Sequence, residues 1–289
     1  MSTEAKFQAA MAGAGLVPPE TINGDGYLHR FGVGGKSCFY VLHLDGIPAG
    51  SYGDWKTGHT ETWCAKSKAD MSDTERQATR GRIKAAQRQR DAERGRAHTE
   101  AASRALAIWM AAAPAIEHPY LTRKAIKAHG VRTDGHYLLI PMRDATGKLW
   151  SLQTISSEGD KRFQPGGRVK ACYCSIGAPE GRIVICEGYA TAATINESTG
   201  GGVVAAFSAG NLLPVALSLR NKYPDLSITV AADDDWKTPG NPGISAAREA
   251  AAAVGASLAV PDWTGLVRGK SDSDFNDVAR LHREQGAAS

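Results

Sequence analysis

Hydrophobic and polar positions alternate in a regular order over the last third of the chain, from Arg182 onward. Short apolar runs rich in β-branched residues predict buried strands, and longer amphipathic stretches between them predict helices. The strands are expected at 183–186, 203–207, 227–232 and 257–260, and the helices at 190–198, 212–222 and 244–253. Strands that alternate with helices of this length are typical of a mostly parallel sheet with right-handed crossovers. We therefore expect an α/β fold with helices flanking a parallel sheet.

The first part of the chain has a different pattern. Aromatic and β-branched residues between 26 and 65 predict a small antiparallel sheet, with turns near Gly34-Gly35 and Asp45-Gly46. Residues 72–113 lack proline and favour a long helix, which Gly81 and Gly95 weaken. Because its first half is too polar for a core helix, it is either a solvated connector or an arm that faces phosphates.

The middle of the chain mixes both kinds of element. A helix is expected at 118–129, opened by Pro119, and strands are expected at 137–142 and 149–155. These patterns divide the chain into four parts. They are a small β-rich region (1–66), a basic helical connector (67–113), an α+β subdomain (114–180) and the α/β domain (181–289).

The charge pattern matters more than the total charge. A net charge of +4 and a pI near 8.8 are mild and do not by themselves indicate nucleic-acid binding. Positive charge gathers between residues 76 and 104, whereas the last hundred residues carry clustered aspartates. This distribution suits a protein that holds a polyanion with one part and metal ions with another.

The cysteine content and the hydropathy of the chain indicate where in the cell the protein is expected. The five cysteines are an odd number without a CxxC pair, and no secretory signal precedes them, so we expect reduced thiols and a cytoplasmic protein. No apolar run approaches the roughly 20 residues that a membrane-spanning helix needs, so we expect no membrane partner.

Acidic residues follow two of the predicted strands. Glu187 comes directly after the strand 183–186, and Asp233, Asp234 and Asp235 follow the strand 227–232. The carboxyl ends of parallel strands gather along one edge of a sheet, so these side chains are expected to converge. Converging carboxylates repel one another unless a cation is present, and Mg²⁺ prefers such ligands. The alternative interpretation is a solvated turn at 233–235 and a helix cap at Glu187.

A third acidic group follows the last predicted strand. It contains Asp272, Asp274 and Asp277, whose spacing allows some side chains to reach the same edge of the sheet. The alternative is that Ser273 or Asp274 caps a final helix that starts near Phe275. The sequence leaves both interpretations open.

These acidic residues resemble a known signature. Cys186-Glu187-Gly188-Tyr189 together with Asp233-x-Asp235 is similar to the motif of the Toprim family, which includes bacterial primases, topoisomerases and certain nucleases. The resemblance implies that Glu187, Asp233 and Asp235 coordinate Mg²⁺, with Asp274 and Asp277 as further ligands. Asp234, in the middle of the triplet, has no role that the resemblance assigns.

The residues before this motif resemble the core of bacterial, DnaG-type primases. The similar segments are Tyr120-Leu121-x-Arg123-Lys124, Leu139-Ile140-Pro141-Met142-Arg143-Asp144 and Lys161-Arg162-Phe163. On this resemblance, 114–180 is a primase-core-like subdomain and 181–289 a Toprim domain. The segments 187–192 and 274–277 are most similar to Toprim proteins of phages and conjugative plasmids.

The resemblance implies a DNA primase that synthesises short RNA primers on single-stranded DNA from ribonucleoside triphosphates. Mg²⁺ is the implied cofactor, with Mn²⁺ as a substitute, and a replicative helicase is a candidate partner. Lys161 is the expected catalytic cation. The residues expected to hold template or nucleotide are Arg143, Lys161, Arg162, Arg168 and Lys170, with Arg88 and Arg90 on the long basic helix. For each of these, an ordinary surface charge is an equal alternative.

Three departures from the primase pattern stand out. No paired cysteines form a zinc ribbon, and the spacing of Cys38, His43, His59 and Cys64 does not favour a substitute site, so we expect no zinc. The asparagine that follows the family's lysine has no counterpart after Lys161. A helicase-docking module is also not expected after the Toprim region.

Two other functions remain open on the sequence. One is a Toprim nuclease that acts on DNA or RNA with the same metal centre, and the other is a non-catalytic protein that binds single-stranded DNA. Trp55 and Trp63 are candidates for base stacking, although packing in the small sheet is the better interpretation of both.

Overall fold

A computed structural model describes residues 1–32, 37–54, 57–67 and 71–286. In its longest helix the side chains of residues 82–83, 85–87 and 89–90 are not described, and neither is that of residue 286. The turn expected at Gly34-Gly35 and the candidate Trp55 lie outside the described residues. The chain divides into two compact units, Met1–Ala92 and Glu93–Ser289. The four-part division expected from the sequence stays a prediction.

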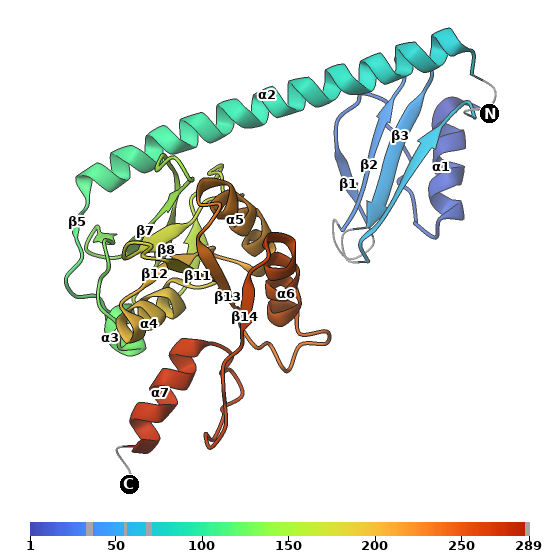
Figure 1. Cartoon of the computed structure of the whole chain (residues 1–289). Helices are drawn as coiled ribbons and strands as arrows, with labels where there is room; N and C mark the ends of the chain where they lie inside the picture. Colours follow the sequence, from blue (N-terminus) through green and yellow to red (C-terminus); the bar gives the residue numbers. More distant parts are fainter. Residues whose placement is uncertain (33–36, 55–56, 68–70, 287–289) are drawn as a thin grey trace. The chain divides into compact units, whose positions relative to one another are not determined.

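The first unit contains the predicted antiparallel sheet, with four strands in the order β1-β2-β3-β4 (Figure 1). The strands are His29–Phe31, Cys38–His43, Ala49–Asp54 and His59–Cys64. Helix α1 (Thr3–Gly13) buries Phe7 and Met11 against the sheet. The rings of Trp63 and Phe7 meet edge-on at 5.3 Å, which confirms that Trp63 belongs to this core.

The long helix predicted over 72–113 is confirmed as α2 (Asp73–Ala111), and the division between the two units falls within it. Its described side chains are mostly exposed as far as Glu100, as its polar composition predicts. From Ala101 onward one side is buried, and Ala105 and Trp109 pack with Leu139 and Leu152.

The second unit begins with an antiparallel sheet in the order β5-β6-β7-β8-β9. Its strands are Ala113–Pro114, Arg132–Thr133, Leu138–Arg143, Leu149–Ile155 and Lys161–Phe163. The helix predicted at 118–129 is shorter than expected: α3 runs Pro119–Lys124. It ends there because Ala125 adopts the left-handed conformation, with φ 50°, and its N–H caps the last turn.

The predicted parallel sheet is present in the same unit, with the strand order β10-β12-β11-β13-β14. The strands are Cys174–Ile176, Gly202–Ala205, Arg182–Cys186, Ser227–Ala231 and Ser257–Ala259. All neighbours pair in parallel except the edge strand β10, which runs antiparallel to β12. The helices are α4 (Tyr189–Thr199), α5 (Ala209–Lys222), α6 (Pro242–Val254) and α7 (Phe275–Gly286).

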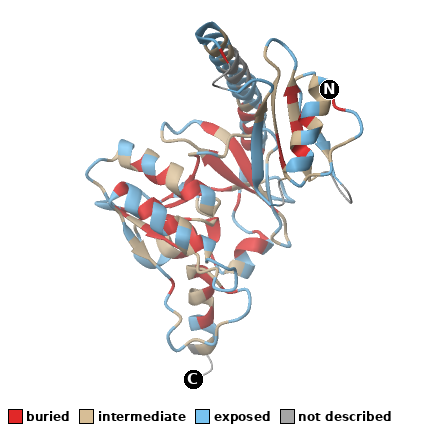
Figure 2. Ribbon diagram, turned by 90° about the vertical axis from the view of Figure 1, so that its right-hand side faces the viewer, coloured by how far each residue is buried: buried red, intermediate tan, exposed pale blue. Residues whose placement is uncertain are grey.

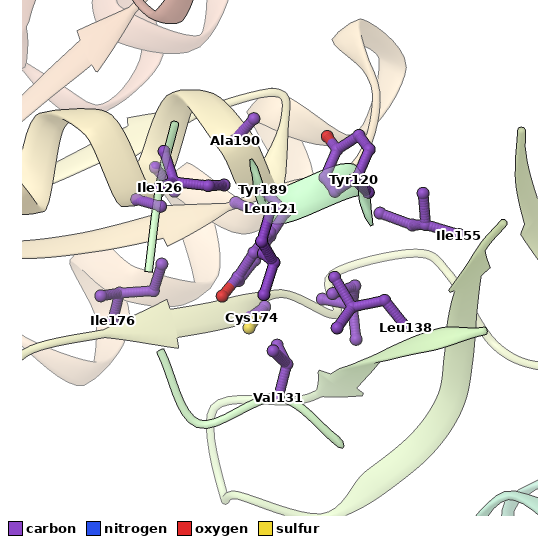
Figure 3. Close-up of a cluster of buried hydrophobic side chains, with 14 of the residues drawn as sticks. Tyr120, Leu121, Ile126, Val131, Leu138, Ile155, Cys174, Ile176, Tyr189 and Ala190 are labelled. Carbon is purple, nitrogen blue, oxygen red and sulfur yellow. The ribbon is translucent and has the colours of Figure 1, made fainter. Parts of the chain in front are cut away.

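Alternate residues of each strand pack against different layers, because successive side chains of a strand point to opposite faces. On one face Ile183 and Ile185 of β11 lie in a cluster with residues of α5 and α6. On the other face Val184 and Cys186 lie in a cluster with residues of α3 and α4, which Figure 3 shows. The central strand β11 is therefore covered on both faces, whereas the flanking helices keep an exposed side (Figure 2).

A buried amide fastens the segment before β10 to helix α5. Asn211 accepts a hydrogen bond from the Ala171 N–H at 2.8 Å. Its Nδ2 contacts the carbonyl oxygens of Val169, Cys172 and Ala206 at 3.2, 2.9 and 2.8 Å. Buried polar groups need such partners, so this one residue satisfies several backbone groups that are distant in sequence.

Among the described residues, none of the helices combines the length and the apolar character that crossing a bilayer requires.

Candidate metal centre

Two acidic side chains emerge at the carboxyl ends of neighbouring strands. Strands β11 and β13 are parallel and in register, with Ile185 opposite Val230. Glu187 is the first residue after β11, and Asp233 follows the end of β13 by two residues. The structure therefore brings Glu187 and Asp233 to the same edge of the sheet, here called the acidic edge.

Burial and mutual repulsion both act on these two carboxyl groups. Burial, together with the charges of Glu187, Asp274 and Asp235, raises the pKa of Asp233 to about 8. Burial and the charge of Asp235 raise the pKa of Glu187 to about 7, although the Ala209 backbone N–H and Lys161 oppose this shift. Shifts of this kind indicate charges that the protein itself does not neutralise.

One oxygen of each group also lacks a partner. Glu187 Oε1 and Asp233 Oδ1 are buried and accept no hydrogen bond from the described protein atoms. An unpaired buried carboxylate is costly, and a hard cation with carboxylate affinity would relieve the cost at both residues. Within the described part of the chain, no three His, Cys, Asp or Glu side chains already surround one point as a finished ligand set. The residues fit a cation whose remaining ligands are water or substrate oxygens.

Asp235 lies beside them but is held by the start of α6. Its Oδ2 accepts a hydrogen bond from the Gly243 N–H at 3.0 Å, and its own N–H donates to Asn241 Oδ1 at 2.9 Å. A Cβ at Gly243 would overlap the backbone carbonyl of Asp233. Gly243 is therefore required for the close approach of α6 to this loop.

Asp234, in the middle of the triplet, is fully occupied by protein groups. It accepts hydrogen bonds from Arg268 Nη1 at 2.7 Å, Asn241 Nδ2 at 2.6 Å and Trp263 Nε1 at 3.2 Å. Burial works to raise the pKa of Asp234, but the hydrogen bonds from Asn241 and Arg268 outweigh it and hold the pKa below its ordinary value. Asp234 is thus a structural anchor.

The third acidic group mainly builds the start of α7. Asp274 Oδ1 accepts the N–H of Asp277 at 2.9 Å, and Asp277 Oδ2 accepts the N–H of Ser273 at 3.0 Å, a reciprocal capping arrangement. The alternative that Asp274 caps the last helix is confirmed. Asp277 also pairs with Lys124 at 3.6 Å, and Asp272 pairs with Arg280 at 2.8 Å. Asp274 nevertheless lies near enough for its charge to raise the pKa of Asp233.

Lys161 on β9 reaches the acidic edge from the antiparallel sheet. Although the residue as a whole is exposed, protein atoms crowd its ammonium group and, with the charge of Lys124, lower the pKa of Lys161. The carboxylates of Asp274 and Asp233 oppose that shift. Lys161 is therefore close enough to Asp274 and Asp233 for their charges to act on its pKa.

The sequence profile of the Toprim domain matches residues 182–285. Residues 182–285 form a Toprim domain. This chain is 39% identical to a DNA primase TraC of Escherichia coli over an alignment of 285 residues, which covers 90% of this chain and 20% of that protein. A second DNA primase TraC of Escherichia coli is 40% identical over 256 residues, which covers 82% of this chain and 24% of that protein. This chain therefore spans between a fifth and a quarter of the length of those relatives.

A solved structure also aligns with this chain. The primase fragment of the bacteriophage T7 primase-helicase protein aligns at 17% identity with a TM-score of 0.43. The alignment covers 60% of this chain and 73% of that one.

The other basic residues predicted from the sequence lie in several parts of the chain. Arg143 Nη1 donates to the Gly147 carbonyl at 2.9 Å within the β7–β8 turn. Arg168 lies 4.9 Å from the Trp150 ring centroid and 3.8 Å from Asp144 Oδ2. Arg162 is exposed on β9, and Lys170 lines a surface hollow of about 600 Å³ at the start of α5. Arg88 is exposed on α2, whereas the side chain of Arg90 lies outside the described residues.

The cysteine and histidine residues of the first unit have other neighbours. His59 Nε2 lies 3.1 Å from Glu61, His43 Nδ1 lies 3.9 Å from Asp45, and Cys38 contacts Ser37. The expectation that no zinc is bound stays a prediction.

Reasoning from the sequence missed the contribution of two residues, Arg268 of the Toprim domain and Tyr120 of α3. Arg268 donates a hydrogen bond to Asp234, which lies 34 positions earlier in the sequence, and no local sequence pattern predicts that pairing. Tyr120, which the primase resemblance had quoted without a role, has a buried hydroxyl with no partner among the described protein atoms. Burial and the charge of Asp274 raise the pKa of Tyr120, which places the phenol near the acidic edge.

Proposed function

We propose that this chain is the catalytic part of a DNA primase, which synthesises short RNA primers on single-stranded DNA. The observation that carries the proposal is the pair of buried, unpartnered carboxylate oxygens of Glu187 and Asp233 at adjacent strand ends of a Toprim domain. The DNA primases TraC of Escherichia coli support the choice of reaction.

Mg²⁺ is the proposed cofactor, with Mn²⁺ as a substitute. Glu187 and Asp233 would hold it, with Asp235 and Asp274 as further candidates and Asp277 as the least available, because Asp277 is engaged by Lys124 and two backbone N–H groups. When bound, Mg²⁺ neutralises triphosphate charge and stabilises the charge that develops during phosphoryl transfer.

The chain's own residues would bind and orient the substrates. In the proposed reaction a primer 3′ hydroxyl attacks the α-phosphate of a ribonucleoside triphosphate, a new phosphodiester bond forms, and pyrophosphate leaves. Lys161 is the candidate to hold a phosphate oxygen, because its ammonium already lies near Asp233 and Asp274.

The remaining basic residues differ in whether their side chains are already hydrogen-bonded to the protein. Arg162 and Lys170 are exposed and are proposed to hold template or nucleotide phosphates. Arg143 and Arg168 are tied to neighbouring backbone carbonyls, so they are proposed to contact phosphate with fixed geometry. Arg88 and Arg90 on α2 are proposed to grip the template backbone without reading its sequence.

The proposed partners are single-stranded DNA, ribonucleoside triphosphates and a replicative helicase. Because the template and nucleotides of such a reaction are cytoplasmic in bacteria, we propose a cytoplasmic location. The process served is the replication of a phage, a plasmid or another mobile element.

Primer synthesis by the Asp233→Ala variant tests the proposal. The assay combines single-stranded DNA, labelled ribonucleotides and either Mg²⁺ or Mn²⁺, and we expect short primers from the wild-type protein. Asp233→Ala should reduce the yield by at least about a thousandfold, the scale of losing a main electrostatic stabiliser, while DNA binding is retained. The matched control is Asp225→Ala, which removes an exposed aspartate at the opposite end of strand β13 and should leave the yield unchanged.

Each alternative gives a different result in the same tube. A nuclease would shorten the strand in a metal-dependent way, and a binding protein would only retard it in a gel. Full primer yield from Asp233→Ala would reject the metal assignment.

A further inference from the structure

A partly exposed tryptophan follows the acidic edge directly. Trp236 is the residue after Asp235, and 50% of its surface is exposed. One exposed aromatic side chain is ordinary on a protein surface. Trp236 stands out among the exposed hydrophobic residues of the described chain because its ring packs against a cation whose position is fixed by hydrogen bonds.

That cation is Arg268, whose guanidinium carbon lies 5.0 Å from the ring centroid of Trp236 and 4.0 Å from that of Trp263. The guanidinium donates hydrogen bonds to Asp234 Oδ2 at 2.7 Å, to the Asp234 carbonyl at 2.6 Å and to the Asp272 carbonyl at 3.0 Å. Only 16% of the Arg268 side chain is exposed. The stack is therefore rigid.

The support of the stack is also the support of the acidic edge. Arg268 is bonded to Asp234, which lies between Asp233 and Asp235 in the chain. The backbone N–H of Trp236 donates to the Asp234 carbonyl at 2.8 Å. Both the backbone of Trp236 and the cation beneath its ring are therefore held by Asp234.

The charges around the indole favour an anionic ligand with a flat ring. Lys237 Nζ lies 4.8 Å from the Trp236 centroid and is on an exposed residue, and Lys270 is exposed in the loop that carries Arg268. A base of a nucleic-acid strand offers a π-face for the indole, and the phosphates of the strand suit the ammonium group of Lys237 beside the ring. Single-stranded nucleic acid combines both features.

We propose that Trp236 is a stacking platform for one base of the single strand that enters the acidic edge. This inference rests on the proposed function and deepens it by naming a residue that holds the template. The sequence had directed attention to Trp55 and Trp63 instead, of which Trp63 belongs to the core of the first unit. Trp236 acts by binding and takes no part in the chemistry.

Fluorescence anisotropy in EDTA tests the platform without any catalysis. The probes are a fluorescein-labelled oligothymidylate and a strand of the same length that has abasic sites in place of bases. We expect Trp236→Ala to bind the oligothymidylate about tenfold more weakly, the scale of losing one base–aromatic stack. Trp236→Phe should lose no more than about threefold, because a smaller aromatic face remains. Both variants should bind the abasic strand as the wild-type protein does.

The control variant is Leu217→Ala, which removes a side chain of α5 that is 44% exposed and should leave both affinities unchanged. Wild-type affinity of Trp236→Ala for the oligothymidylate would overturn the platform and leave the proposed primase function intact. An equal loss on both strands would also overturn it, because the loss would then come from charge or folding. If the wild-type protein binds neither strand, the proposed function fails together with the platform.

Discussion

Asp233 and Asp234 are neighbours in the chain, yet the structure surrounds their carboxylates in opposite ways, one with hydrogen-bond donors and the other without. Asp234 receives three side-chain hydrogen bonds, and its pKa lies below the ordinary value. Asp233 has a buried oxygen without a partner, and its pKa is raised to about 8. Acidity in the sequence therefore does not mark a metal ligand. We propose that the metal ligand is marked instead by a carboxylate that the rest of the protein leaves unsatisfied, as it leaves Asp233.

The same contrast separates the acidic edge from the third acidic group. Asp272, Asp274 and Asp277 all accept hydrogen bonds from backbone N–H groups, and two of them also pair with cations. Two acidic groups that look alike in the sequence thus differ in the structure. The group at 272–277 caps the start of α7, whereas Glu187 and Asp233, at two parallel strand ends, each keep a carboxylate oxygen without a hydrogen-bond partner.

The largest expected effect on stability is that of Asp234→Ala. Removing this carboxylate leaves the mostly buried Arg268 without its charged partner, so we expect a loss of about 3 kcal/mol in the free energy of unfolding. Urea denaturation in EDTA measures it. Asp225→Ala should change stability by no more than about 0.5 kcal/mol, as exposed substitutions do. Equal losses for Asp234→Ala and Asp233→Ala would remove the distinction between the two residues.

A smaller effect is expected from pH. In the folded protein the pKa values of Asp233 and Glu187 are raised to about 8 and about 7, above their ordinary values of 3.8 and 4.5. Between those limits the folded protein binds more protons than the unfolded chain, so stability falls as the pH rises. In EDTA we therefore expect the free energy of unfolding to decrease steadily between pH 5 and pH 8, as both carboxyl groups lose their protons.

Two additions sharpen the pH experiment. Asp233→Asn should remove much of the slope, because the amide does not titrate, and Mg²⁺ at pH 8 should restore the lost stability of the wild-type protein. Denaturation curves across this pH range supply the measurement. Stability in EDTA that increases from pH 5 to pH 8 would show that these carboxyl groups are not under strain.

The smallest effect is expected from Asp274→Ala. Losing the cap of α7 should cost about 1 kcal/mol, and primer yield should fall only if Asp274 also contributes to the metal centre. Ser273→Ala is the matched control, because the described contact of Ser273 with Asp277 uses its backbone N–H. Thermal unfolding and primer yield, measured on both variants, separate the two roles. An unchanged melting temperature for Asp274→Ala would exclude the capping role.

The parallel sheet was predictable because its strands are short, continuous apolar runs. The predicted strand at 183–186 and the observed strand Arg182–Cys186 differ by one residue, and helices lie between the strands as expected. The acidic edge followed from this topology, since parallel strands end together. The convergence of Glu187 and Asp233 therefore required no more than the strand order.

The parts that escaped prediction depend on contacts between distant segments. The helix expected at 118–129 ends at Lys124 because Ala125 turns left-handed, a conformation that alanine rarely adopts. The role of Asp234 depends on Arg268 and Trp263, both in a loop with no regular pattern. The base-stacking candidates were chosen from a sheet whose described tryptophan, Trp63, is partly buried and packs against the core, whereas Trp236 is supported by tertiary contacts.

Asn211 has a consequence for how a ligand would be received. Its amide joins the start of α5 to residues 169–172, beside Arg168 and Lys170. Residues 169–172 cannot move away from α5 without breaking several hydrogen bonds at once. This segment is therefore expected to stay in place and not to act as a mobile loop. A ligand that bound at this segment would therefore meet a surface whose shape is already set by the Asn211 hydrogen bonds.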